Sequence, residues 1–152
     1  MNTLVLIGYE YIYGDPSRSS DPSRSSVFLL NLIREIYTFL SAASFNHSRI
    51  VELLLENGAD PEAKDMLAMT PFLMAVTLGG NESAKILLDH GADITATDSS
   101  LNSCLHLAII YMRSEIVKML LERDIDKVLI QSKDKDLRSV FHSAAGLQNS
   151  EV

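Results

Sequence analysis

Apolar residues recur at helical spacing in short segments of this chain, and each segment ends at a turn signal. The clearest example runs from Asp65 to Thr97. Thr70 and Pro71 open an apolar segment, two glycines end it, and a second amphipathic segment stops at Gly91. A threonine hydroxyl can accept the free N–H groups of a helix start, and proline loses no hydrogen bond there. Glycine favours the left-handed residue that ends a helix. The pattern therefore predicts two helices joined by a tight turn.

The same pattern recurs at a nearly constant period. Units begin at Asp65 and Asp98, 33 residues apart, which is a spacing typical of stacked helical repeats. A further unit begins at Asp134, after an insertion of three residues within Lys127 to Lys133. We expect repeats at about residues 32–64, 65–97, 98–133 and 134–152, of which the last is incomplete.

The start and stop signals place three helix pairs. The expected pairs are Tyr37–Phe45 with Arg49–Asn57, Pro71–Leu78 with Glu82–His90, and Cys104–Tyr111 with Glu115–Arg123. Each pair has an apolar stripe that it cannot bury alone, and stacking joins these stripes into one elongated core. The predicted fold class is all-α: a solenoid of stacked antiparallel helix pairs with short β-turn-like tips.

The first 26 residues differ from the repeats. The hexad Asp15 to Ser20 is polar and rich in serine, and Asp21 to Ser26 repeats it without change. Such a segment buries too little apolar surface to order itself, so residues 1–26 are expected to form an N-terminal segment with a flexible linker. Serines close to arginines also suit a phosphorylation target, which is the alternative. The repeat domain is expected at residues 27–152, with an apolar helix running in from Val27.

Charge and composition narrow the range of functions. The 152-residue chain has a net charge of −7, and nine acidic residues against two lysines lie between Glu52 and Asp98. This acidic middle disfavours nucleic acid as a partner. The most apolar run, Val27 to Leu40, is too short for a membrane span and is interrupted by charge, so no direct membrane insertion is expected. The single cysteine excludes an internal disulfide and favours a cytoplasmic location, with the nucleus left open.

No catalytic or cofactor-binding constellation is evident. His106 and His142 lie in successive units, each three residues after a serine, and a metal pair or a base is one interpretation. The usual metalloprotease, zinc, hydrolase and phosphate-binding motifs are missing, so we expect no enzyme, no metal and no cofactor. Cys104 stands at a predicted helix start. A reactive thiolate and a small residue packed in a turn are both compatible with that position.

Taken together, these residues resemble ankyrin repeats. The match is carried by Thr70-Pro71, Leu105-His106-Leu107-Ala108, Glu115 to Glu122, and the Gly-Ala-Asp stops after the second helices. It covers about three and a half repeats and suggests a piece of a longer array. In this family the histidine holds the turn through hydrogen bonds, which is the expectation for His106 and His142. Ala68, Leu101 and Leu137 replace the family's turn glycine, so less regular turns are expected.

The resemblance implies a non-enzymatic module that binds a partner protein through the concave face and the turn tips. The binding positions implied are Met66, Leu67, Met69, Thr77, Leu78, Ser99, Ser100, Asn102, Ile110 and Tyr111. Three of them, Met66, Leu67 and Met69, are apolar residues in one tip, where water is the ordinary neighbour. They either touch a partner or pack on neighbouring tips.

Two further expectations concern the whole chain. The insertion before Asp134 is similar to that in ankyrin-rich transient receptor potential channels, so the alternative function is a cytosolic fragment of such a membrane protein. The incomplete fourth repeat leaves an apolar face without cover, so either the last helix frays or the chain self-associates through that repeat. The residues of that face are Val140, Phe141, Ala144 and Leu147.

Overall fold

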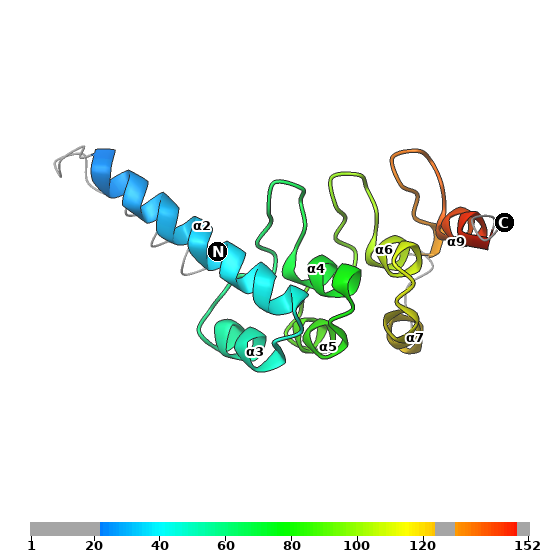
Figure 1. The fold of residues 1–152 in the computed structure, drawn as a ribbon, viewed down its shortest axis with the longest axis horizontal. Coiled ribbons are helices and arrows are strands. Elements are labelled where there is room, and N and C mark those ends of the chain that lie inside the picture. Colours follow the sequence, from blue (N-terminus) through cyan, green and yellow to red (C-terminus); the bar gives the residue numbers. More distant parts are fainter. Residues whose placement is uncertain (1–21, 124–129, 149–152) are drawn as a thin grey trace.

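The computed structural model describes residues 22–123 and 130–148. In these ranges it contains helices and no β-strand. The labelled helices are α2 (Pro22–Ser44), α3 (Ser48–Glu56), α4 (Pro71–Leu78), α5 (Asn81–Asp89), α6 (Cys104–Ile110), α7 (Ser114–Glu122) and α9 (Val140–Gln148). Helices α2, α4, α6 and α9 form one layer, α3, α5 and α7 form a second, and the long loops project as tips beyond the first layer (Figure 1). The predicted all-α repeat solenoid is confirmed.

The helix starts follow the predicted signals. The Thr70 hydroxyl accepts a hydrogen bond of 3.2 Å from the Leu73 N–H, and Pro71 occupies the first turn of α4. Gly79 ends this helix with φ of 85°, in the left-handed region. In α6 a serine takes the place of the threonine: Ser103 and His106 form a reciprocal capping box. Both devices pair backbone groups that a helix start would otherwise leave free.

Side chains of neighbouring repeats cap helix ends in the second repeat. The start of α5 has no side-chain cap of its own, but the Asn46 side chain accepts a hydrogen bond of 3.0 Å from the Ser83 N–H. The end of α4 is capped by Arg113, whose Nε donates to the Thr77 carbonyl at 2.9 Å. An ion pair joins Arg123 to Asp89 on the outer layer. Side chains of the first and third repeats therefore complete the backbone hydrogen bonding of the second.

The core is continuous from α2 to α9 because small residues let the first helices approach closely. Ala42, Ala75 and Ala108 occupy equivalent positions, and all three are buried. A Cβ atom on Gly80 would lie 2.7 Å from the Ala43 carbonyl oxygen. Ala144, expected at the equivalent place in α9, is exposed instead, since no described residue covers that side of the helix.

The tips share one geometry. An aspartate opens each tip, and its Oδ1 accepts two backbone N–H groups, as Asp65 does from Leu67 and Met69. Ala68, Leu101 and Leu137 then adopt φ of 58°, 61° and 62°. The expectation of less regular turns is therefore wrong. The aspartate and its hydrogen bonds fix the turn, and the residue at the glycine position accepts the left-handed conformation.

The first described helix begins earlier than the helix expected from Val27. Helix α2 begins at Pro22, so Pro22 to Ser26, expected in the linker, are helical. A proline in the first turn has no N–H to leave unpaired, and the apolar helix that follows extends back to it. The rest of the expected linker, at 15–21, lies outside the described residues, as do residues 124–129, which include part of the predicted insertion. No described helix is long and apolar enough to span a membrane.

Candidate functional site

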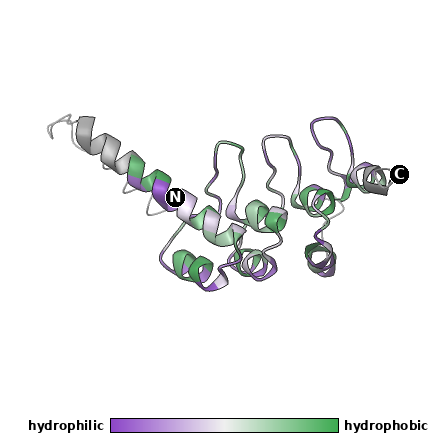
Figure 2. Cartoon of the chain, in the orientation of Figure 1, coloured by the Kyte–Doolittle hydropathy of each residue, from purple (hydrophilic) through white to green (hydrophobic). Residues whose placement is uncertain are grey.

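The surface between the tips and the first helices carries little charge. Helices α4, α6 and α9 contain no acidic residue, lysine or arginine. The second helices α5 and α7 each combine a lysine with acidic residues. Hydrophobic residues accordingly colour most of α4 and α6, while α5 and α7 mix both kinds (Figure 2). We call the side formed by these three uncharged helices and by the tips the inner surface.

Most of the predicted binding residues are accessible on the inner surface. Met66 is 92% exposed, and Leu67 beside it is also exposed. Leu78, Ile110 and Tyr111 are exposed at the ends of α4 and α6. Ser99 is exposed, and the remaining polar members of the set are half-buried: Thr77, Ser100 and Asn102. The apolar positions that a partner could contact thus extend over two repeats.

Met69 is the exception. Only 8% of it is exposed, and it belongs to the core cluster. It follows the left-handed Ala68 and directly precedes the buried Thr70, and this change of chain direction takes it into the core. The prediction that Met69 is an accessible binding residue is therefore wrong, although Met66 and Leu67 of the same tip are exposed.

Backbone hydrogen bonds link neighbouring tips. The Ser99 N–H donates to the Leu67 carbonyl at 2.9 Å, and the Lys135 N–H donates to the Ser100 carbonyl at the same distance. Within the third tip, the Asn102 amide donates to Asp98. The Thr77 hydroxyl donates within its own helix to the Leu73 carbonyl. These bonds hold the inner surface in one shape before any partner arrives.

A hollow of about 390 Å³ lies between the third and fourth repeats on this side. It brings together three predicted residues, Ser100, Asn102 and Ile110. Sequence reasoning missed the others that line it: Asp134, Lys135, Asp136, Arg138, His142 and Ser143. The start of the fourth unit at Asp134 was the available signal, but the binding positions implied by the resemblance include no residue of the fourth tip. We call this hollow the tip groove.

Hydrogen bonds in the tip groove stabilise the charged forms of Asp134 and Arg138. The pKa of Asp134 is lowered, chiefly because its carboxylate accepts the Arg138 N–H and also because the Asp136 N–H and the Arg138 charge favour the ionised form. The pKa of Arg138 is raised, mainly by its hydrogen bond to Asp136. An oriented arginine between two carboxylates, with Lys135 beside them, makes this end of the inner surface polar.

The two histidines hold turns. His106 is buried, with Nδ1 2.8 Å from the Ser103 hydroxyl and Nε2 3.2 Å from the Arg138 carbonyl. A carbonyl can only accept, so Nε2 carries the proton and donates it across to the fourth tip. His142 repeats the contact with Ser139 at 2.8 Å, on an exposed turn. The expected turn-holding role is confirmed, and no group of three metal-binding side chains occurs among the described residues.

Cys104 is a packed core residue. It is fully buried, its Sγ lies 3.4 Å from the Ile94 carbonyl, and burial raises the pKa of the thiol to about 12. A thiol with that pKa stays protonated at neutral pH and is a poor nucleophile. Of the two interpretations of Cys104, the structure supports the small residue packed in a turn.

Comparison with known proteins agrees with this architecture. A family model described as ankyrin repeats, in three copies, matches residues 39–131, which is more than half of the chain. A search of curated proteins found no match. Ankyrin repeats are generally protein–protein interaction modules, and the family is typically non-enzymatic.

Proposed function

We propose that this chain, which belongs to the ankyrin-repeat family, is a non-enzymatic module that binds a partner protein through its inner surface. The observation that supports this most is the set of apolar side chains left in solvent beside uncharged helices. Met66 and Leu67 project from a tip, and Leu78, Ile110 and Tyr111 are exposed at the helix ends. Exposed apolar groups of this kind, held on a rigid scaffold, suit protein recognition.

The turn conformation supports the same proposal. Leu101 is 53% exposed, at φ of 61°, a region that disfavours a branched side chain. Glycine would adopt this conformation without strain, and a polar residue would suit the solvent better. Neither folding nor solubility explains an exposed leucine at that position, whereas contact with a partner does.

The distribution of charge indicates what kind of segment binds. The centre of the inner surface, along α4 and α6, suits an uncharged, apolar part of the partner, since an unpaired charge buried there would lose its hydration. The tip groove suits a polar end, where Lys135 and Arg138 can face a carboxylate and Asp136 a basic group. We therefore expect a partner segment with apolar side chains in its middle and charges at one end.

Affinity measurements on surface variants test this proposal. Once a candidate partner is in hand, Tyr111→Ala and Leu67→Ala are expected to weaken binding about tenfold or more, as truncation of a central apolar contact does. Leu53→Ala is the matched control, because Leu53 is an exposed apolar residue on α3, in the outer layer. Unchanged affinity in both inner-surface variants, or an equal loss in the control, would overturn the proposal.

The location in the cell stays a prediction, and so does the alternative that this is the cytosolic ankyrin part of a transient receptor potential channel. That alternative rests on the insertion within Lys127 to Lys133 and on no other feature. The described part of the chain adds only that none of its helices could span a membrane.

A further inference from the structure

Both ends of the described repeat array expose apolar positions that are buried between repeats elsewhere. On the second helices, Ile50, Ser83 and Ile116 occupy equivalent positions; the last two are fully buried, but Ile50 is exposed. Ile50 belongs to the first repeat, so this position is buried only where another repeat precedes it, and it therefore faces the preceding repeat. The next position is occupied by Val51, Ala84 and Val117, of which the first two are fully buried and Val117 is half-buried. That position faces the following repeat.

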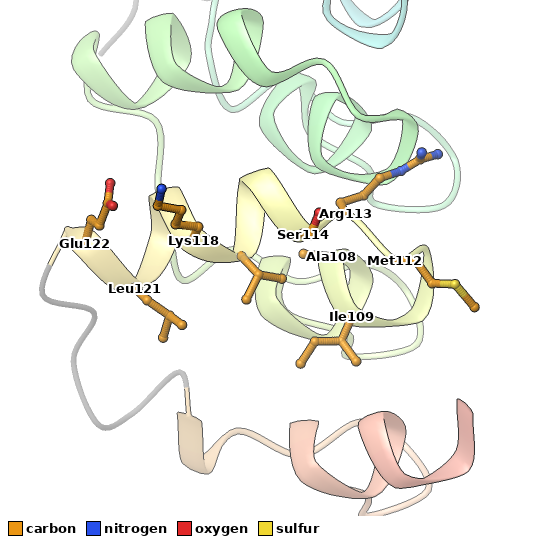
Figure 3. A pocket seen from close by; sticks show the side chains of 9 residues that line it. Ala108, Ile109, Met112, Arg113, Ser114, Lys118, Leu121 and Glu122 are labelled. Carbon is orange, nitrogen blue, oxygen red and sulfur yellow. The ribbon is translucent and has the colours of Figure 1, made fainter. Parts of the chain in front are cut away.

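The open side of α7 forms an apolar groove. The groove has a volume of about 540 Å³, and Ile109, Met112, Val117 and Leu121 supply its apolar lining. Leu121 is 55% exposed, whereas its counterparts Leu55 and Leu88 are half-buried. Ile109 and Leu121 point to the same side of the array, toward the fourth repeat, whereas Lys118 and Glu122, which also line the groove, point away from them (Figure 3). We call this surface the α7 groove.

The array itself shows what fits such a groove. Helix α5 packs beside α3, and α7 packs beside α5. At the second of these contacts Asp89 pairs with an arginine, Arg123, of the following helix. Glu122 holds the position of Asp89 on α7. The natural occupant of the α7 groove is thus an amphipathic helix with a basic residue next to its apolar stripe.

Helix α2 has these properties. Its first half extends beyond the helix pairs at the end of the array opposite α7 (Figure 1). Leu30 and Ile33 at the end of this half, and Tyr37 one turn further on, are exposed at helical spacing, and Arg34 lies beside them. The charge of Arg34, which flanks the apolar stripe, is opposite to that of Glu122, which lines the groove. Because helix and groove lie at opposite ends, one molecule cannot fill its own groove.

We propose that the exposed part of α2 between Leu30 and Tyr37 of one molecule docks in the α7 groove of a second copy, so that the chain associates head to tail. Leu30, Ile33 and Tyr37 then cover Val117 and Leu121, and Arg34 pairs with Glu122. The contact joins two different surfaces. It therefore leaves one free helix and one free groove on every assembly, and growth continues unless a ring closes.

The test uses the full chain in analytical ultracentrifugation over about two orders of magnitude in concentration, because mass action makes association concentration-dependent. The unmodified protein is expected to form dimers and larger species as the concentration rises. Leu121→Glu, which blocks the groove, and Ile33→Glu, which blocks the helix, are each expected to be monomeric. Both residues are partly exposed, and an unchanged circular dichroism melting curve verifies the fold. Lys85→Glu, at an exposed position of α5 in the middle of the array, is the control and should associate normally.

Mixing the two blocked variants distinguishes this contact from others. Leu121→Glu retains a working helix, and Ile33→Glu retains a working groove, so the mixture is expected to form one-to-one dimers and nothing larger. Arg34→Glu should weaken association, and adding Glu122→Arg should restore it. A chain that stays monomeric throughout would overturn the proposal. So would a mixture that stays monomeric, or loss of association in the helix variant alone, which would mean that α2 pairs with α2.

Discussion

The side chain of Asn46, in the first repeat, caps helix α5 of the second by accepting the Ser83 N–H at 3.0 Å. Asn46 itself has φ of 55°, a conformation that asparagine tolerates better than most residues. Asn46→Ala is expected to lower the free energy of unfolding by about 1–2 kcal/mol, because the cap is lost and the left-handed backbone loses a tolerant residue. Asn46→Asp keeps the acceptor and should cost less. Urea unfolding measures both, and equal losses would show that the cap contributes nothing.

Gly80 lies where two first helices approach closely. Its φ of −76° suits any residue, so only the contact of a Cβ atom with the Ala43 carbonyl, at 2.7 Å, opposes alanine. Gly80→Ala is expected to destabilise the fold by about 1–3 kcal/mol through overpacking. Gly58 is the matched control, since it has positive φ but open space around its Cα. Gly58→Ala should therefore cost only backbone strain, about 1 kcal/mol. Thermal unfolding compares the two, and a harmless Gly80→Ala would contradict the close packing.

The leucines of the tips are strained in place. Leu101 and Leu137 have φ near 60°, a conformation that glycine adopts without a steric penalty. Each change to glycine is expected to raise the free energy of unfolding by about 0.5–1 kcal/mol, after the entropy that glycine gains in the unfolded chain is deducted. Ser99→Gly, in the same tip as Leu101 and outside the left-handed region, should not stabilise. The denaturant midpoints of the variants and the unmodified protein measure these changes. A loss of stability in Leu101→Gly would mean that the leucine side chain has a structural role.

The thiol of Cys104 gives a pH-dependent prediction. Its pKa rises from an ordinary value of 9.0 to about 12 in the folded protein, mainly through burial. The folded state then retains a proton that the unfolded state loses, so stability is complete below pH 9 and falls as the pH rises toward 12. Cys104→Ala should lessen this fall.

Thiol labelling checks the same group directly. At pH 8 the folded protein should react with a disulfide reagent far more slowly than the urea-unfolded protein does. Rapid labelling of the native protein would mean that Cys104 is accessible and that its pKa is ordinary.

Local signals explain why the repeats could be predicted. Thr70, Pro71 and Gly79 act within a turn of their own helix, so their effect is visible in the sequence. Met69 was misplaced because its direction depends on the left-handed conformation of Ala68, and the alanine at this glycine position suggested an irregular turn instead. The tip groove and the cap from Asn46 depend on residues more than thirty positions apart, which a repeat pattern does not register. The start of α2 at Pro22 was missed because the composition of the hexad suggested a linker.

Photo-crosslinking tests the central claim, that the inner surface binds a partner protein, most directly. A crosslinking amino acid is placed at Tyr111, on the inner surface, or at Leu53, on the outer layer, and the chain is irradiated in cell extract. The account predicts a discrete protein adduct from position 111 that Leu67→Ala diminishes, with little from position 53. Crosslinks mainly from position 53, or adducts from position 111 whose yield Leu67→Ala does not change, would contradict binding through the inner surface.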